Sequence, residues 1–199
     1  MCWLLKALSL SKVKMMSYIK ILGVDPSFRN FGYAPMLYDP ATKELKLVEL
    51  DLIQTKPNKD KDVRKNSADL ACAKILIEEY KLRCAWSDVV VAEVPVGTQS
   101  ARAAWSLGIA LCVLATTNKP LVQVTPKQVK ECSVGDPKAS KQDMIDWATT
   151  AHPHSDWLTR KVKGKVVLTN ANEHLADAVA AVYAGIETDQ FKGMLALRP

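Results

Sequence analysis

A carboxylate that closes a run of apolar residues constrains this chain more than any other feature. Asp25 follows the apolar residues 21–24 and precedes Pro26, so it stands where a buried strand should end. Ionised Asp is rarely buried unpaired, so a carboxylate in this place usually binds a cation or hydrogen-bonds the next loop. Glu93 closes the run 89–92 in the same way, and Asp177 lies in a helical pattern. Three acids from three elements indicate an oxygen-rich site for magnesium or manganese.

Each acid also has a plain structural explanation. Asp25 before a proline can end a strand in an Asx-type turn, and Glu93 can be a charge at a strand end. Asp177 can cap or pair on an amphipathic helix. Because all three would have to arise independently, the shared site is the favoured interpretation.

The length of 199 residues suits one sizeable core and is too short for two comfortable domains, so we expect a single α/β domain. Residues 18–25, 31–38 and 44–53 predict an antiparallel meander of three strands, and further strands are predicted at 88–93 and 121–124. Helices are predicted from Ser67 as the cap, at 102–117, 126–132 and 139–151, and from near Asn172 to about Glu187.

Three regions of the chain have a less definite expectation. The helix 102–117 is apolar almost all round, so we expect it in the core or in a subunit interface. Residues 152–170 predict a loop or partly ordered insertion. The domain is expected over 18–188, between an N-terminal extension (1–17) and a C-terminal tail (189–199), both of uncertain order.

Basic residues gather in clusters, and the formal net charge is +6. A basic surface around an acidic pocket fits a polyanionic substrate whose phosphates need metal, although any one cluster can equally be a solvated loop. The clusters are Lys56, Lys59, Lys61, Arg64 and Lys65; Lys127, Lys130, Lys138 and Lys141; and Arg160, Lys161, Lys163 and Lys165.

The five cysteines contain no CxxC pair, which is typical of reduced thiols in a cytosolic protein. No apolar run approaches the length that spans a membrane, and the first residues make a poor signal peptide. We therefore expect a cytoplasmic protein with no membrane partner.

Three segments together resemble the motifs of the RuvC family of Holliday-junction resolvases, which have the RNase H-like nuclease fold. They are residues 21–27 running through Gly32-Tyr33, Ala92-Glu93 followed by Ser106-Leu107-Gly108, and His174-Leu175-Ala176-Asp177-Ala178. Any one motif is weak, but their order and separations agree with the family from about residue 18 to 186. The resemblance implies a central mixed five-stranded sheet flanked by helices.

The resemblance also implies the activity and its residues. Asp25, Glu93, His174 and Asp177 would hold two Mg²⁺ ions, with Mn²⁺ as a substitute, and a homodimer would make paired nicks in four-way junctions that leave 5′-phosphate and 3′-hydroxyl ends. In such two-metal sites one ion activates water and the other stabilises the leaving oxygen. The cell would be bacterial or phage-infected. Lys130 and Lys141 match basic positions of the family near the active site, and Lys141 would also stabilise transition-state charge. The DNA-binding set would be Lys127, Lys130, Lys138, Lys141, Arg160, Lys161, Lys163 and Lys165.

Several features depart from the family or stay ambiguous. Many members carry a carboxylate where this chain has His174, and imidazole is a softer ligand for magnesium. His152 and His154 are interpreted as loop residues. Family members commonly have an aromatic residue shortly after the second acid that stacks on an unpaired base, whereas residues 94–97 here are Val-Pro-Val-Gly. The basic segment 160–165 also lengthens the connection before the last helix, which can widen the range of branched substrates.

Three other functions compete with the resolvase. An actin-like or sugar-kinase ATPase also begins with a strand, an Asp and a Gly-containing turn, but it needs a second lobe for which the chain has no room. A catalytically silent branched-DNA-binding module would gain affinity by discarding the acids. A fork or flap nuclease of broader range shares the predicted chemistry and differs in substrate.

Overall fold

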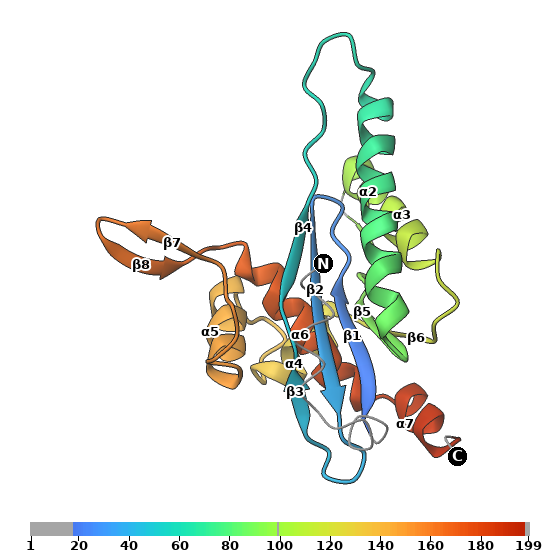
Figure 1. Cartoon of the computed structure of the whole chain (residues 1–199), viewed down its shortest axis with the longest axis vertical. Coiled ribbons are helices and arrows are strands. Elements are labelled where there is room, and N and C mark those ends of the chain that lie inside the picture. The colour runs from blue at the N-terminus through green and yellow to red at the C-terminus, as the bar shows by residue number, and fades with distance from the viewer. Residues whose placement is uncertain (1–17, 99, 198–199) are drawn as a thin grey trace.

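The computed structural model describes residues 18–98 and 100–197, and its centre is a mixed sheet (Figure 1). The strand order is β3-β2-β1-β5-β6, and β4 also pairs with β2. β1 pairs antiparallel with β2 and parallel with β5, which is parallel to β6. The strands are β1 (Ile19–Asp25), β2 (Asn30–Tyr38), β3 (Leu45–Leu47), β4 (Asp51–Gln54), β5 (Val89–Glu93) and β6 (Leu121–Val124). The predicted α/β class with a mixed sheet is confirmed.

The third predicted strand, 44–53, is broken into two. β3 pairs with residues 36–38 of β2, and β4 pairs with residues 30–33 of the same strand. Between them the backbone N–H of Val48 donates to the carbonyl of Pro35 at 2.9 Å, and Leu50 turns into the core. The sheet therefore has six strands in five positions.

Helices cover both faces of the sheet (Figure 1). α2 (Lys65–Trp86) and α3 (Ala101–Leu114) pack on the face that carries Leu22 and Val90. α4 (Pro126–Ser133), α5 (Lys141–Ala151) and α6 (Asn172–Ile186) pack on the opposite face with Ile21 and Val91. Because successive strand residues point to opposite faces, the continuous apolar runs of β1 and β5 supply both cores.

Three local expectations need correction. α2 begins before Ser67, and its N-cap Arg64 makes no side-chain cap. The predicted loop 152–170 contains an antiparallel hairpin of β7 (Thr159–Val162) and β8 (Lys165–Leu168). The predicted tail 189–199 contains the helix α7 (Asp189–Ala196), whose Phe191 packs edge-on against Tyr38 with ring centroids 5.5 Å apart. Residues 1–17 lie outside the described residues.

The apolar helix α3 is mostly not in the core. Only Ala110, Val113 and Leu114 are buried, whereas Trp105 is 49% exposed. Of the two environments predicted for this helix, the core is wrong for most of its length. No helix in the described ranges is both long and apolar enough to cross a bilayer.

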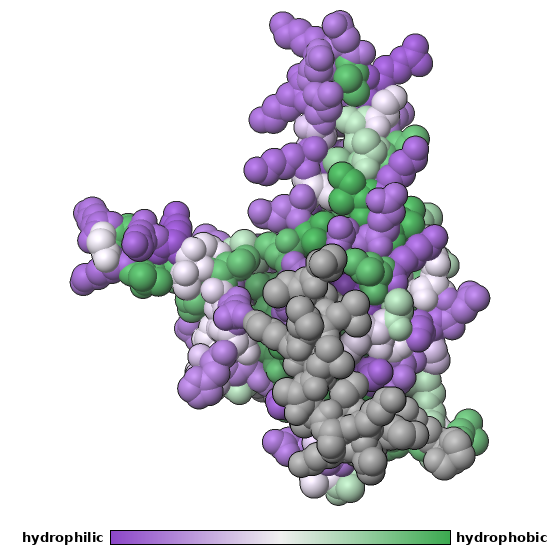
Figure 2. Space-filling view, viewed as in Figure 1, coloured by the Kyte–Doolittle hydropathy of each residue, from purple (hydrophilic) through white to green (hydrophobic). Residues whose placement is uncertain are grey.

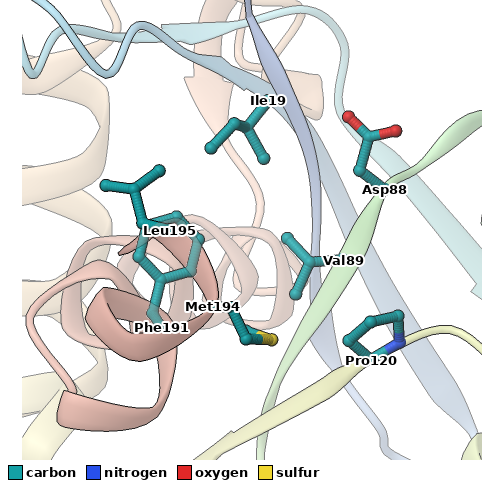
Figure 3. Close-up of a pocket in the computed structure, with 7 residues that line it drawn as sticks. All are labelled: Ile19, Asp88, Val89, Pro120, Phe191, Met194 and Leu195. Atoms are coloured by element: carbon teal, nitrogen blue, oxygen red, sulfur yellow. The ribbon is translucent and has the colours of Figure 1, made fainter. Parts of the chain in front are cut away.

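A small, mostly apolar pocket lies where α7 meets the sheet (Figure 3). Ile19 and Val89, which line it, stand at the starts of β1 and β5. The acids Asp25 and Glu93 stand at the other ends of the same strands. This pocket is therefore separate from the acidic site.

Two glycines let α6 lie directly on the sheet. A Cβ added to Gly23 in β1 would come within 2.2 Å of the Ala178 carbonyl oxygen, and one added to Gly32 in β2 would come within 2.3 Å of the His174 carbonyl oxygen. Both neighbours are backbone atoms of α6, so they cannot rotate away. The absence of a side chain at these two positions sets the height of α6 above the sheet.

A buried carboxylate connects the loops on the other face. Asp69 of α2 is 1% exposed and accepts hydrogen bonds from Arg29, in the β1–β2 loop, at 2.5 Å and from Arg102, in the first turn of α3, at 3.0 Å. Burial acts to raise the pKa of Asp69, but the bonds from the two arginines outweigh it and lower the pKa. Asp69 thus joins the loop after Asp25 to the helix that follows the Glu93 loop.

The first prediction tests the glycine contact. Gly23→Ala should lower the free energy of unfolding by about 1–3 kcal/mol, because overpacking forces the helix or strand to shift. The matched control is Gly193→Ala in α7, where an added Cβ meets nothing within 4 Å. That control should raise stability by about 0.5–1 kcal/mol through helix propensity. Urea unfolding measures both, and equal effects would contradict the close approach of α6.

The second prediction concerns pH. Asp69→Asn should cost about 1–3 kcal/mol at neutral pH, because charge-assisted hydrogen bonds to two arginines are weakened. Since the folded pKa of Asp69 is lowered, its stabilising contribution is present above the unfolded pKa, near 3.9, and is lost as pH falls through the folded value. The stability difference between wild type and variant should therefore shrink below about pH 4. A difference that stays constant from pH 7 to pH 2.5 would contradict this role.

Candidate active site

Asp25 and Glu93 lie side by side because their strands are parallel. Val24 of β1 pairs with Ala92 of β5, and Asp25 and Glu93 are the next residues of the two strands. Carboxyl ends of adjacent parallel strands meet at one edge of a sheet, which is the usual place for a site in an α/β fold. The sequence prediction that these two acids share a site agrees with this arrangement.

The third acid and the histidine come from α6. His174 and Asp177 are three residues apart, so they share one side of the helix. His174 Nδ1 lies 2.6 Å from Asp25 Oδ2, across 149 residues of sequence. This contact depends on Gly32, whose bare backbone lies against that of His174. α6 thereby places His174, from the last sequence motif, next to Asp25, from the first.

Burial and nearby carboxylates raise the pKa values of all three acids. Burial, followed by repulsion from Asp177 and Asp25, raises the pKa of Glu93 to about 9. Burial and then Asp25 raise the pKa of Asp177 to about 7. Burial also raises the pKa of Asp25, against the opposing effect of His174. The free energy of keeping all three ionised is therefore unfavourable without a cation.

His174 supplies part of the missing positive charge. Burial acts to lower its pKa, but the hydrogen bond to Asp25 and the nearby charges of Glu173 and Asp177 outweigh burial, so the pKa is raised. The imidazole is thus held as a partner of Asp25. In the described ranges 18–98 and 100–197, no three His, Cys, Asp or Glu side chains are already grouped to hold a metal ion.

The donor set nevertheless suits a divalent cation. Three carboxylates with raised pKa values offer hard oxygen ligands, and a cation would offset the repulsion that raises those values. Asp25, Glu93 and Asp177 can supply oxygen, and His174 can supply nitrogen if its proton is displaced.

The basic residues predicted to bind DNA lie on α4, on α5, between these two helices and on the β7–β8 hairpin. Lys130 of α4 is near the acids, since its charge acts to lower the pKa values of Glu93 and Asp177. Lys141, the first residue of α5, pairs with Glu173 at 2.8 Å. Lys127 pairs with Glu131 at 3.6 Å, Lys138 is exposed between α4 and α5, and Arg160, Lys161, Lys163 and Lys165 lie on the β7–β8 hairpin.

His152, His154 and the segment after Glu93 also stand out in the sequence. His152 ends α5 and its Nε2 lies 3.2 Å from the Tyr183 hydroxyl, with no contact to the acids among the described residues. His154 is exposed. Val96, in the segment after Glu93, is 90% exposed.

Glu173 is a site residue that the sequence reasoning missed. Its side chain holds Lys141 and lies 3.4 Å from His174 Nε2. The signal was available, because Glu173 precedes Asp177 by four residues and such residues are neighbours on a helix. The Asp69–Arg29–Arg102 cluster was also missed, since only the fold brings these three together.

Comparisons with known proteins agree with this geometry. The family described as crossover junction endodeoxyribonuclease RuvC matches residues 21–150. The RuvC of Salinibacter ruber is 31% identical over 128 residues, which cover 62% of this chain and 67% of that protein.

Solved structures show the same fold. T. thermophilus RuvC in complex with a Holliday junction substrate has a TM-score of 0.60 at 16% identity, covering 89% of this chain and 96% of its own. The yeast mitochondrial Holliday junction resolvase Ydc2 has a TM-score of 0.54 at 14% identity, covering 89% and 80%.

The family match extends over well over half of the chain, and it includes the strands that end in Asp25 and Glu93. The third acid lies beyond the matched segment, and the fold carries it to the same edge of the sheet. The chain belongs to the RuvC family, and it is a crossover junction endodeoxyribonuclease that depends on a divalent metal.

Proposed function

We propose that this protein resolves four-way DNA junctions by paired nicks, using Asp25, Glu93, His174 and Asp177 as the metal site. The observation that carries the proposal is the convergence of three partly buried acids on one sheet edge, with pKa values raised by burial and by neighbouring carboxylates. A catalytically silent DNA-binding module has no use for such a cluster, because it repels phosphate.

Two Mg²⁺ ions per site, with Mn²⁺ as a substitute, fit the proposed donor set. When bound, such ions activate water for attack and stabilise the leaving oxygen. Asp25 and Glu93 are the last residues of the rigid strands β1 and β5, and Asp177 and His174 come from α6, which packs on the sheet. His174 Nδ1 lies 2.6 Å from Asp25 Oδ2, and the imidazole would have to be neutral to serve as a nitrogen ligand.

Two lysines position the DNA strand beside these acids. Lys141 is 79% exposed at its side chain and is held by Glu173, so it is available to a phosphate next to the site. Lys130 lies close enough to the acids to affect their pKa values. We assign both to the scissile or flanking phosphates, with Lys141 also stabilising transition-state charge.

The third prediction tests the acids. Glu93→Gln and Asp177→Asn should each reduce junction cleavage in Mg²⁺ by at least about 100-fold, because each loses a ligand charge in the reaction centre. Junction binding in Ca²⁺ should be retained or tighten, since repulsion of phosphate falls. Cleavage of a labelled junction and a gel-shift titration measure the two effects.

The matched control is Glu131→Gln, an exposed acid of α4 outside the cluster. It should cut junctions at close to the wild-type rate. If Glu93→Gln cut as fast as this control, Glu93 would not belong to the reaction centre. Labelled forked and flapped DNA in the same assay distinguishes a nuclease of broader range.

We also propose that the enzyme acts as a homodimer. Two opposed nicks need two sites, and a two-fold dimer matches the two-fold symmetry of the junction. The exposed apolar side chains Leu70 and Leu82 of α2 and Trp105 of α3 support an interface on this side of the molecule. A second copy would shield them from water.

The fourth prediction tests this assembly. Wild type should be a dimer by light scattering at micromolar concentration, and Trp105→Glu should shift it towards monomer because a charge enters an apolar contact. The control Val134→Glu, an exposed apolar residue at the end of α4, should remain dimeric. A wild-type monomer, both alone and with junction DNA, would remove the dimer and favour a single-nick enzyme.

A further inference from the structure

We propose that the β7–β8 hairpin is a clamp for one duplex arm, held at a fixed distance from the acidic site. This inference rests on the proposed junction-resolving function and adds a substrate requirement to it. The hairpin stands away from the body of the protein (Figure 1), and its surface carries hydrophilic side chains beside apolar ones (Figure 2).

The hairpin is built as a regular ribbon. Thr159 pairs with Leu168 and Val162 with Lys165, and the turn between the strands is Lys163-Gly164. Both turn residues have positive φ, 48° and 80°, as a two-residue type I′ turn requires. A ribbon closed by this turn keeps its strands in one register and holds its side chains in defined positions.

The root of the hairpin is fixed to the helix that carries the site. Asn172, the first residue of α6, is fully buried, and its side chain makes two hydrogen bonds with the backbone of Leu158. Asn172 Nδ2 donates to the Leu158 carbonyl at 2.8 Å, and the Leu158 N–H donates to Asn172 Oδ1 at 2.9 Å. The N–H of Thr169 donates to the same carbonyl at 3.0 Å. The root of the hairpin is therefore bonded to a residue of α6 only two positions before His174, and these bonds restrict its pivoting.

The charge of the hairpin identifies its partner. Residues 159–168 contain four basic side chains and no acid, and none of the four forms an ion pair with any described residue. Val162, Val166 and Leu168 are exposed on the same ribbon. A two-stranded ribbon fits the major groove of B-DNA, where lysines reach phosphates and apolar side chains contact base edges. Duplex DNA satisfies both sets of side chains.

The reach of the hairpin sets a length for that arm. At about 3.3 Å per residue, a strand of four residues and its turn extend roughly 15 Å from the root. The five residues from Asn172 to Asp177 add about 7.5 Å along the helix. The tip therefore lies up to about 22 Å from the acids, which corresponds to roughly six base pairs at 3.4 Å each.

The fifth prediction uses a variant that keeps the ribbon. Lys161→Gln, Lys163→Asn and Lys165→Gln together remove three charges, and asparagine tolerates the positive φ of the turn. The slope of log affinity against log salt for junction DNA should fall by up to about 2.7, or 0.9 for each lost phosphate contact. The matched control is Lys20→Gln, Lys43→Asn and Lys46→Gln, because Lys43 also has positive φ, 62°. Lys20 lies on β1, Lys43 in the turn before β3 and Lys46 on β3. The salt slope of this control variant should stay that of wild type.

Arm length gives the decisive measurement. Each arm of a four-way junction is shortened in turn from about fifteen to about five base pairs and closed with a loop, so that the shortest arm ends before the tip. Wild type and control should lose affinity as one arm falls below about six base pairs, whereas the hairpin variant should be indifferent to that arm. Equal arm-length dependence in all three proteins, or an unchanged salt slope in the hairpin variant, would overturn the clamp.

A second variant tests the fixed distance. Asn172→Ala leaves all hairpin charges in place but removes both bonds to Leu158. It should retain most of the salt slope while its affinity falls gradually, without a step, as the arm shortens. A step as sharp as that of wild type would show that Asn172 does not set the distance. A wild-type protein that binds junctions no better than linear duplex would instead refute the proposed function itself.

Discussion

The site depends on one close approach, that of α6 to the first two strands of the sheet. Gly23 and Gly32 leave no side chain between the strands and the helix, so backbone meets backbone at both positions. The helix would otherwise lie higher, and His174 could not reach Asp25 at 2.6 Å. The position of His174 beside Asp25 thus depends on two glycines that carry no side chain. Cores at this packing density transmit such a displacement instead of absorbing it.

That approach concentrates negative charge where it is unfavourable. Glu93 and Asp177 are largely removed from water, and the charges of Lys130, of His174 and of Lys141 offset their repulsion only in part. A fold that needed only stability would not retain such a cluster, because desolvated like charges cost free energy. Carboxylates whose pKa values are perturbed in this way point to function, and a nuclease that must hold divalent cations against phosphate is the function that uses them.

The opposite face of the sheet has a different task. There α2 and α3 share an apolar core with β1 and β5, and Asp69 ties their ends to the β1–β2 loop. Trp105 of α3 is 49% exposed on this layer. Under the proposals made above, the α6 face and the hairpin bind DNA, and the α2–α3 face forms the subunit interface.

Local patterns in the sequence determined a large part of this protein. An apolar run closed by an acid is visible in Asp25 and Glu93 because the end of a buried strand is a local property, and the spacing of His174 and Asp177 is visible because helix neighbours are close in sequence. The tertiary structure decided what depends on distant partners. Asp69 could not be recognised from its neighbours, since both of its arginines come from other elements. The histidines, the proline and the basic run of 152–170 predict a loop or partly ordered insertion, whereas the order of the hairpin comes from a turn with positive φ and from the buried amide of Asn172.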